Sequence, residues 1–352
     1  MRAKNLWFVS GVVLGAGVLS YALVKRSRRT RAESLAWQKL RRPNLNMLAC
    51  PKCRGSLNFI YSSEADLYHC PACQTDYPVV DGIAHFIQPQ EMTGFNKQFA
   101  QMYDWFSWGY RLFSKIAFAY IGMAEDQARR EVTDRLEPGG GRVLEVSTGP
   151  GVNLPYLVGR PDVGEIFGLD ISLGQLNRCR EYVAHQGWDV QLQLGNAEQL
   201  PYQDNTFDGV FHLGGINFFN DKQKAIEEMV RVAKSGTRIL ICDENEKGAR
   251  AYERFLPGFK RMAGESRDVI VPPMELVPPE MQEVRLFDVW NGWMYCIEFR
   301  SPDARRMNES GCLSWSGCDY HGGIGRDRQS PGFAAGAPGS QGGHRRAPCP
   351  TA

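Results

Sequence analysis

The residues best suited to chemistry lie in a short stretch that begins at Arg142. Arg142–Gly151 reads RVLEVSTGPG, an apolar run that ends in an acid and a glycine-containing turn. A second apolar run, Ile166–Ser172, contains Asp170 near its end. A turn of small residues lets backbone N–H groups approach a ligand at a helix N-terminus, and a carboxylate about 20 residues further on can bind ribose hydroxyls. The spacing predicts a βαβ unit that binds a nucleotide-like ligand.

Four cysteines form a second candidate site. They occur as two Cys-x-x-Cys pairs, Cys50 with Cys53 and Cys70 with Cys73, separated by 16 residues. Two such pairs can surround a tetrahedral Zn²⁺, and four protein thiolates leave no position for a reacting water. The pattern predicts a structural zinc ribbon whose folding depends on the metal, with His69 and His85 as non-ligands. A redox Cys-x-x-Cys is the alternative.

The glycine turn is not a dinucleotide fingerprint, because GxGxxG is absent and Glu145 stands inside the turn. Residues 145–151, EVSTGPG, resemble the E/D-x-G-x-G-x-G motif of class I S-adenosylmethionine-dependent methyltransferases, with Ser147 in place of the first glycine. Three more stretches follow in the order found in ubiquinone and menaquinone methyltransferases: 195–201 (GNAEQLP), 205–211 (NTFDGVF) and 231–237 (RVAKSGT). The resemblance covers residues 139–300.

The resemblance implies that S-adenosylmethionine is the cofactor and that eight residues bind it. Glu145, Gly149 and Gly151 would shape the turn around the methionine part, and Asp170 would hold the ribose. Asn196, where the family usually has Asp, would lie by the adenine together with Ala197. The predicted cofactor set is Glu145, Ser147, Gly149, Gly151, Asp170, Ile171, Asn196 and Ala197.

His212 is the candidate general base. It stands near the end of the apolar run 208–213, and in open α/β sheets the carboxyl ends of the strands face the ligand crevice. An imidazole there can accept a proton from a phenol, thiol or enol. A structural histidine is the alternative, and Asp243 and Glu244, which follow the next strand, are further candidates.

Alternating apolar runs and amphipathic stretches must position these residues. We expect strands at 142–147, 165–170, 190–195, 208–213, 237–242, 283–290 and 293–300, and helices at 151–159, 173–186, 221–234 and 247–263. Strands alternating with helices predict a parallel α/β sheet with right-handed crossovers. The resemblance implies the seven-stranded Rossmann-like methyltransferase sheet, with its last strand antiparallel.

Six aromatic residues before the turn recur every three or four positions, which predicts one face of an amphipathic helix. They are Phe95, Phe99, Tyr103, Phe106, Tyr110 and Phe113, while Trp105 and Trp108 fall off this stripe. The stripe either packs into the core or covers an apolar substrate pocket. The Tyr103-Asp104 pair resembles one near the start of the quinone-type enzymes.

The N-terminus carries a candidate membrane anchor. Leu6–Val24 is 19 residues without a charge, enough for a helix that nearly spans a bilayer. Residues 25–42 carry eight Lys or Arg against the single acid Glu33, so the positive-inside rule predicts a single-pass protein with a cytoplasmic catalytic domain. A cleaved secretory signal, with small residues around Ser20–Ala22, is the alternative.

The domain boundaries follow from these features. We expect an anchor at 1–24, a basic linker at 25–46, the zinc ribbon at 47–90, a helical cap at 91–136, the methyltransferase domain at 137–300 and a disordered tail at 301–352. The tail holds ten Gly and five Pro, too little apolar surface for a core.

The leading interpretation is methyl transfer from S-adenosylmethionine to a small lipophilic acceptor at the membrane. The net charge of +2 implies no polyanion partner for the whole chain, so nucleic acid is not expected. An rRNA or tRNA base methyltransferase remains an alternative, because some rRNA enzymes carry a zinc ribbon before the same fold. A second alternative is a non-catalytic scaffold that docks a protein partner through its ribbon.

Overall fold

A computed structural model describes residues 45–61, 66–255 and 269–303. Its centre is a set of five parallel strands, and the chain crosses between them as expected for an α/β fold. They are β5 (Gly141–Val146), β6 (Val163–Asp170), β7 (Val190–Leu194), β8 (Phe207–Leu213) and β9 (Ala233–Glu244). All five lie within a few residues of the predicted strands. The α/β methyltransferase sheet predicted from the sequence is confirmed.

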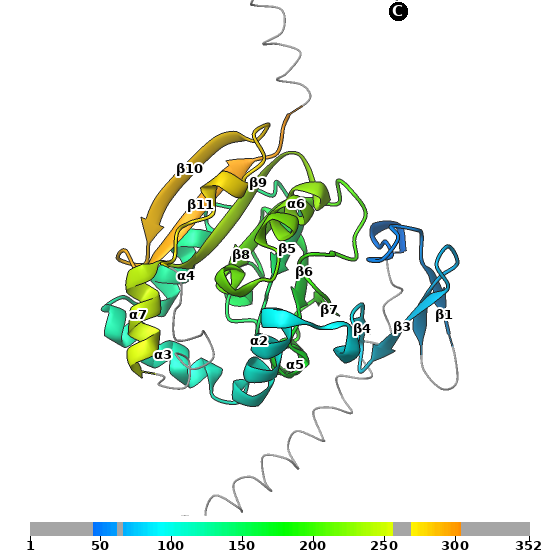
Figure 1. The fold of residues 1–352 in the computed structure, drawn as a ribbon, viewed down its shortest axis with the longest axis horizontal. Coiled ribbons are helices and arrows are strands. Elements are labelled where there is room, and N and C mark those ends of the chain that lie inside the picture. Colours follow the sequence, from blue (N-terminus) through cyan, green and yellow to red (C-terminus); the bar gives the residue numbers. More distant parts are fainter. Residues whose placement is uncertain (1–44, 62–65, 256–268, 304–352) are drawn as a thin grey trace, which may run out of the picture. The chain divides into compact units, whose positions relative to one another are not determined.

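An antiparallel hairpin continues this sheet beyond β9. β10 (Gln282–Val289) and β11 (Met294–Arg300) pair with each other, and β11 also pairs with β9. The expected terminal hairpin is therefore present, and Asn291-Gly292 lie in its turn with left-handed backbone at both residues. Figure 1 shows the hairpin at the end of the sheet away from the ribbon strands.

Four short strands extend the other end of the sheet. They are β1 (Asn58–Ile60), β2 (Leu67–Cys70), β3 (Thr75–Val80) and β4 (Ile83–His85), and β4 pairs in parallel with β7. The sheet order is β1-β2-β3-β4-β7-β6-β5-β8-β9-β11-β10 (Figure 1). The seven strands expected for the methyltransferase sheet, β5 to β11, are therefore present with β11 antiparallel, and the ribbon adds four further strands at the free edge of β7.

Six helices in the described residues pack on the sheet and on each other. They are α2 (Gly94–Phe106), α3 (Tyr110–Ile121), α4 (Glu125–Thr133), α5 (Leu173–Gln186), α6 (Lys222–Val232) and α7 (Glu246–Phe255). The helix predicted at 173–186 is confirmed: the Ser172 hydroxyl accepts from the Gln175 amide at its start, and Gly187 ends it in a left-handed conformation.

Two helix predictions were wrong. Residues 151–159 form only a 3-10 turn, Leu154–Tyr156. Gly151 and Gly159 have positive φ, and the Asn153 side chain bonds Glu145 of β5 and Arg129 of α4. The aromatic stripe does not follow one helix either. The helix ends at Phe106 and another begins at Tyr110, after Gly109, and Phe95 at the start of α2 is exposed.

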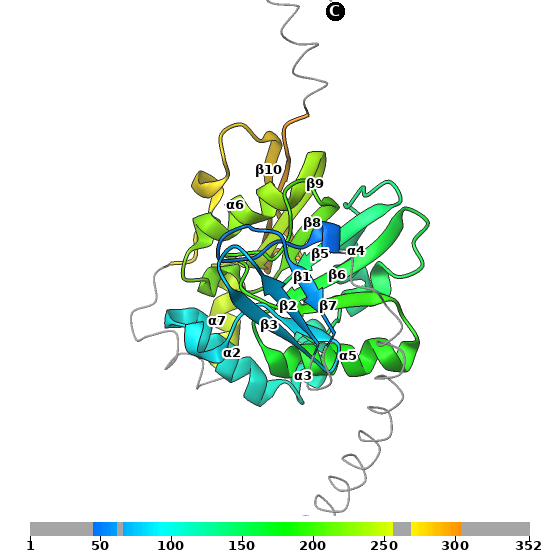
Figure 2. The ribbon, with the colours of Figure 1, turned by 90° about the vertical axis from the view of Figure 1, so that its right-hand side faces the viewer.

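The core has two parts, one on each face of the sheet. Residues of α6 pack in one part, and residues of α4 and α5 pack in the other. Figure 2 looks along the sheet from the ribbon and shows these helices on opposite faces. Phe86, Tyr68 and Tyr77 of the ribbon region belong to the first part, so ribbon and methyltransferase sheet share one core.

Within the described residues, no helix is both long and apolar enough to cross a bilayer. The predicted anchor at 1–24, nearly all of the linker at 25–46 and most of the tail at 301–352 lie outside the residues that the structure describes.

Candidate cofactor site and cysteine cluster

The glycine turn after β5 has left-handed backbone at three positions. φ is 62° at Ser147, 56° at Gly149 and 73° at Gly151. A serine in this region costs about 1 to 2 kcal/mol, which explains why the resembled motif has glycine at the first position. At Gly151 a Cβ would lie only 2.7 Å from the Cys179 sulfur, so helix packing also requires glycine there.

Glu145, at the end of β5, holds the turn from inside. Its carboxylate accepts hydrogen bonds from the Thr148 hydroxyl at 2.8 Å and from the Asn153 amide at 2.6 Å. Arg129 of α4 donates to the side-chain oxygen Oδ1 of Asn153 at 2.7 Å. Burial raises the pKa of Glu145 to about 7 despite these donors. Glu145 therefore shapes the loop and does not itself line the hollow described below.

Asp170, at the end of β6, holds the same turn from the other side. Its carboxylate accepts from the backbone amides of Gly149 at 2.7 Å and Ser172 at 2.8 Å. Burial raises the pKa of Asp170 to about 6, against the effect of these amides. The sequence placed Asp170 beside the glycine turn, and the structure brings the two together.

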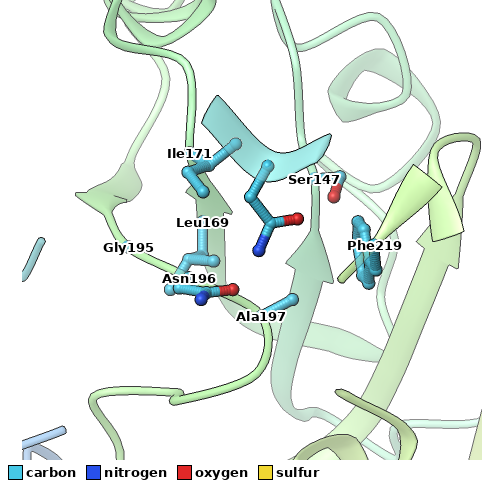
Figure 3. Close-up of a pocket in the computed structure, with 8 residues that line it drawn as sticks. Ser147, Leu169, Ile171, Gly195, Asn196, Ala197 and Phe219 are labelled. Atoms are coloured by element: carbon cyan, nitrogen blue, oxygen red, sulfur yellow. The ribbon is translucent and has the colours of Figure 1, made fainter. Parts of the chain in front are cut away.

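A small hollow lies at the carboxyl ends of β5, β6 and β7 (Figure 3). Four of the predicted cofactor residues line it: Ser147, Ile171, Asn196 and Ala197. The other four, Glu145, Gly149, Gly151 and Asp170, form or hold the turn beside it. The prediction missed four lining residues: Asn96, Leu169, Gly195 and Phe219. Gly195 stands in the quoted 195–201 motif, whereas nothing in the sequence marks Asn96, which lies on α2 far upstream.

Helix α2 lies across the carboxyl ends of the strands and is fastened on both sides of the hollow. The side-chain amide of Asn96 donates to the Glu198 carboxylate at 2.9 Å. At the other end of the helix, the Asp104 carboxylate accepts from the Ser172 hydroxyl at 2.6 Å and from the Gly174 amide at 2.7 Å. The cap helix therefore also covers the loop that follows Asp170 at the end of β6.

Aromatic side chains of the cap extend from the hollow toward β8 and β9. Phe99 stacks on Phe218 with ring centroids 4.1 Å apart, and Tyr103 lies 6.3 Å from Phe99 and 6.4 Å from Tyr110. Burial raises the pKa of Tyr103 well above its usual range, and the charges of Asp243 and Glu244 add to the effect. Both tyrosines therefore keep their phenolic proton at neutral pH.

His212 is fully buried, and both ring nitrogens are engaged within the protein. Nδ1 lies 3.1 Å from the Val146 carbonyl oxygen, to which it donates, and Nε2 accepts from the Ile216 amide at 2.9 Å. Burial lowers its pKa. This neutral histidine joins β5 to the loop after β8, and the geometry does not support the proton-accepting role expected from the sequence.

The four predicted metal ligands lie together. One ligand atom from each of Cys50, Cys53, Cys70 and Cys73 falls within 4.8 Å of the others, and the sulfur pairs Cys50–Cys73 and Cys53–Cys70 are 3.5 Å apart. Four thiolates at about 2.3 Å from Zn²⁺ would be spaced by roughly 3.8 Å, so the cluster fits the metal. His69 instead contacts Asp76 at 2.7 Å, and neither His69 nor His85 belongs to the cluster.

The ribbon is fastened to the methyltransferase sheet by backbone and side-chain contacts. The Ala49 amide donates to the Pro201 carbonyl at 3.1 Å, and the Gln203 amide donates to Met47 at 2.8 Å. Arg54 forms an ion pair with the buried Glu228 of α6. No sequence signal marks these contacts, because they join segments more than 100 residues apart.

Comparison with known proteins gives the family. A family model described as "Methyltransferase domain" matches residues 144–241, and one described as "Trm112p-like protein" matches residues 43–82. A phosphatidylethanolamine N-methyltransferase of Cereibacter sphaeroides is 30% identical over 156 residues, which cover 43% of this chain and 75% of that protein. The chain belongs to the class I S-adenosylmethionine-dependent methyltransferases. The methyltransferase is thus an enzyme, and S-adenosylmethionine is its cofactor.

Two quinone-related enzymes are also similar to this methyltransferase. The ubiquinone/menaquinone biosynthesis C-methyltransferase UbiE of Geobacter sulfurreducens is 34% identical, with 33% of this chain and 46% of that protein covered. The demethylmenaquinone methyltransferase of Symbiobacterium thermophilum is 35% identical, with 41% and 61% covered. The methyltransferase therefore spans about half the length of these quinone-related relatives.

Proposed function

We propose that this methyltransferase methylates a small lipophilic acceptor of the quinone or phospholipid class. The observation that carries the proposal is the aromatic cap next to the cofactor hollow, formed by Phe99, Tyr103, Tyr110 and Phe218. Such side chains favour a flat or apolar acceptor over a polar one. The names of the similar proteins, which are quinone-related and phospholipid methyltransferases, support the same class.

The residues of the hollow suit S-adenosylmethionine. Leu169, Ile171 and Ala197 form an apolar wall for the adenine, with the Asn196 amide beside it. The open turn at Ser147–Gly151 would hold the methionine part, and Asp170 the ribose. The cofactor supplies an activated methyl group, so the protein needs mainly to bind, orient and exclude water.

The acceptor's proton needs a base other than His212. The buried Asp243 carboxylate accepts from three backbone amides, those of Gly215, Asn217 and Glu244, and these bonds hold it against the loop after β8. Glu244 is half-buried, and its charge raises the pKa of Tyr103 and of Tyr110. We assign Glu244 as the proton acceptor and the neutral tyrosine phenols as donors that orient an acceptor oxygen.

A structural Zn²⁺ at Cys50, Cys53, Cys70 and Cys73 belongs to the same proposal. The support is the cluster of four sulfurs together with the similarity of residues 43–82 to Trm112p-like proteins. A protein partner could also dock on the ribbon. We further propose that Leu6–Val24 anchors the chain in a membrane with the catalytic domain on the cytoplasmic side, as the charge pattern predicts.

A labelling experiment tests the acceptor class. Full-length enzyme is incubated with methyl-labelled S-adenosylmethionine and either a membrane lipid extract or total RNA. We expect label in the organic phase and none in RNA. In Asp170→Ala the labelling should fall about tenfold or more, because a turn-holding and ribose-binding carboxylate is lost.

Three results would contradict the proposal. Label that enters RNA with strong salt sensitivity would favour the base-methylating alternative. Cofactor binding in calorimetry without transfer to any lipid or RNA fraction would mean that the acceptor class is wrong. Failure to bind S-adenosylmethionine at all would favour the scaffold.

A further inference from the structure

The outer surface of the cap carries a row of exposed apolar side chains. Trp108, Leu112, Ile116 and Tyr120 are spaced by four residues, so they lie on one face of α3 and the turn before it. Trp105, at the end of α2, precedes them by three. The exposed fractions are 74% for Trp105, 70% for Trp108, 64% for Leu112, 59% for Ile116 and 51% for Tyr120. We call these five residues the cap face.

The apolar residues of the cap face are not the side of α3 that packs into the protein core. The opposite side of α3 is already packed: Phe118 is buried, with its ring 4.8 Å from that of Trp290, and Ser114 is buried beside Glu125 and Arg129. A helix with one packed face needs no second apolar face for folding. Contiguous exposed apolar residues on a folded protein mark a contact with another surface.

The charged residues of α2 and α3 are mostly positive. Between residues 94 and 122 the sequence has Lys97, Arg111 and Lys115 and a single acid, Asp104. The Asp104 carboxylate binds Ser172 and Gly174, and Arg111 lies over the Tyr182 ring and donates to the Pro150 carbonyl. Lys97 and Lys115 are exposed. An apolar row with tryptophans and flanking lysines matches the surface of an anionic bilayer.

We propose that the cap face lies in the headgroup region of an anionic lipid bilayer. A second copy of this chain is less suited to the surface, because two such faces would bring Lys97 and Lys115 of both copies together. The same α2 that leads to this face carries Asn96, which lines the hollow, and Phe99 and Tyr103, which extend from it. A lipid-soluble acceptor can therefore pass from the bilayer directly to the crevice.

This inference deepens the proposed function, and its purpose rests on the lipophilic acceptor, but it can be tested without one. Full-length protein is mixed with phosphatidylcholine–phosphatidylglycerol vesicles whose acyl chains are brominated near the headgroup. Every protein in the comparison also carries Trp7→Phe and Trp37→Phe, because these two tryptophans lie in or next to the proposed anchor. Bromine quenches only nearby tryptophans, so insertion of the cap face is then measured even if Leu6–Val24 holds every variant on the vesicle. In the variant Trp105→Phe/Trp108→Phe, most of the tryptophan quenching caused by the brominated lipid should be lost.

The decisive variant is Leu112→Ser/Ile116→Ser, which keeps both cap tryptophans. We expect quenching by the brominated lipid to fall about twofold or more, because the inserted apolar area is reduced. The matched control is Val284→Ser/Leu286→Ser on β10, whose side chains are 40% and 46% exposed. This control should leave the quenching unchanged.

Other outcomes would overturn the inference. Equal quenching in the wild type and in Leu112→Ser/Ile116→Ser means that the cap face does not touch lipid. A change of oligomeric state in detergent, with unchanged quenching, means that a second copy covers the face. Calorimetric binding of S-adenosylmethionine to the variant is expected to match the wild type, so a failure of the membrane inference stays distinct from a failure of the methyltransferase site.

Discussion

Two buried carboxyl groups hold the cofactor turn from opposite sides. Glu145 accepts from side chains of the turn and of the residues that follow it, and Asp170 accepts from the Gly149 amide. Burial raises the pKa of both, to about 7 for Glu145 and about 6 for Asp170. The turn is thus built around groups that are partly protonated near neutral pH, which links its stability to pH.

The free energy of unfolding should fall as pH rises from about 4.5 to about 7, because over this range native Glu145 holds a proton that the unfolded chain has lost. The rise in the pKa of Glu145 corresponds to a change of at most about 3 kcal/mol in the free energy of unfolding. Glu145→Gln removes the titration, so its unfolding free energy should depend less on pH in this window. Urea unfolding followed by tryptophan fluorescence at several pH values measures the difference.

Glu165→Gln serves as the control, because Glu165 forms an exposed ion pair with Arg142 on a neighbouring strand. Its pH profile should follow the wild type. Parallel profiles for Glu145→Gln and the wild type would show that Glu145 is ionised throughout the range, contrary to the effect of its burial.

The strands of the ribbon join the methyltransferase sheet through the parallel pair β4–β7. The cysteine cluster lies on the ribbon, and Tyr77 contacts the Cys50 sulfur at 3.1 Å while its ring lies 5.3 Å from that of Phe86. Phe86 donates its amide to Leu194 at the end of β7. Through these contacts, an ordered cluster supports the edge of the sheet next to the hollow.

Removal of the metal should therefore loosen β7 as well as the ribbon. Treatment with a strong chelator should speed amide hydrogen exchange in β7 and lower the thermal midpoint, since a four-thiolate site contributes directly to folding free energy. Elemental analysis before treatment should give about one zinc per chain. The same chelator saturated with zinc is the control. Unchanged exchange in β7 would mean that the sheet edge is independent of the metal.

At the scale of the whole molecule, the described parts of the ribbon and methyltransferase regions share one part of the core, although the sequence assigned them to separate domains. Tyr68, Tyr77 and Phe86 from the ribbon region pack in the same cluster as Phe167 and Tyr202 of the methyltransferase region. The β4–β7 pairing also covers an edge strand that would otherwise be free. The two regions therefore form a single folding unit within the described residues.

A chain that begins at residue 91 should consequently aggregate. It would expose the β7 edge and the apolar residues that face the ribbon, whereas a chain that begins at residue 45 keeps both covered. Size-exclusion chromatography and thermal unfolding of the two chains, both ending at residue 303, compare them. Equal midpoints and a monodisperse shorter chain would contradict the shared core.

The pattern of apolar residues, glycines and cysteines determined much of this protein from the sequence. The strands of the central sheet and the helix at 173–186 are set by local periodicity and by caps such as Ser172, so they were predictable. The cysteine spacing indicated a four-thiolate cluster because a tetrahedral site needs little besides two tight turns. The 151–159 prediction failed because loop hydrogen bonds to Glu145 and Arg129 outweighed helix propensity.

Which residues cover the hollow, and which residues join the ribbon to the methyltransferase sheet, was decided only by the tertiary structure. Asn96 reaches the site from α2, Arg54 reaches Glu228 across the ribbon boundary, and His212 becomes a buried link between β5 and a loop. Such contacts join residues far apart in the chain. These contacts depend on which faces of helices and strands pack together. A periodic pattern along one segment shows which of its faces is apolar, but it carries no information about the segment that packs against that face.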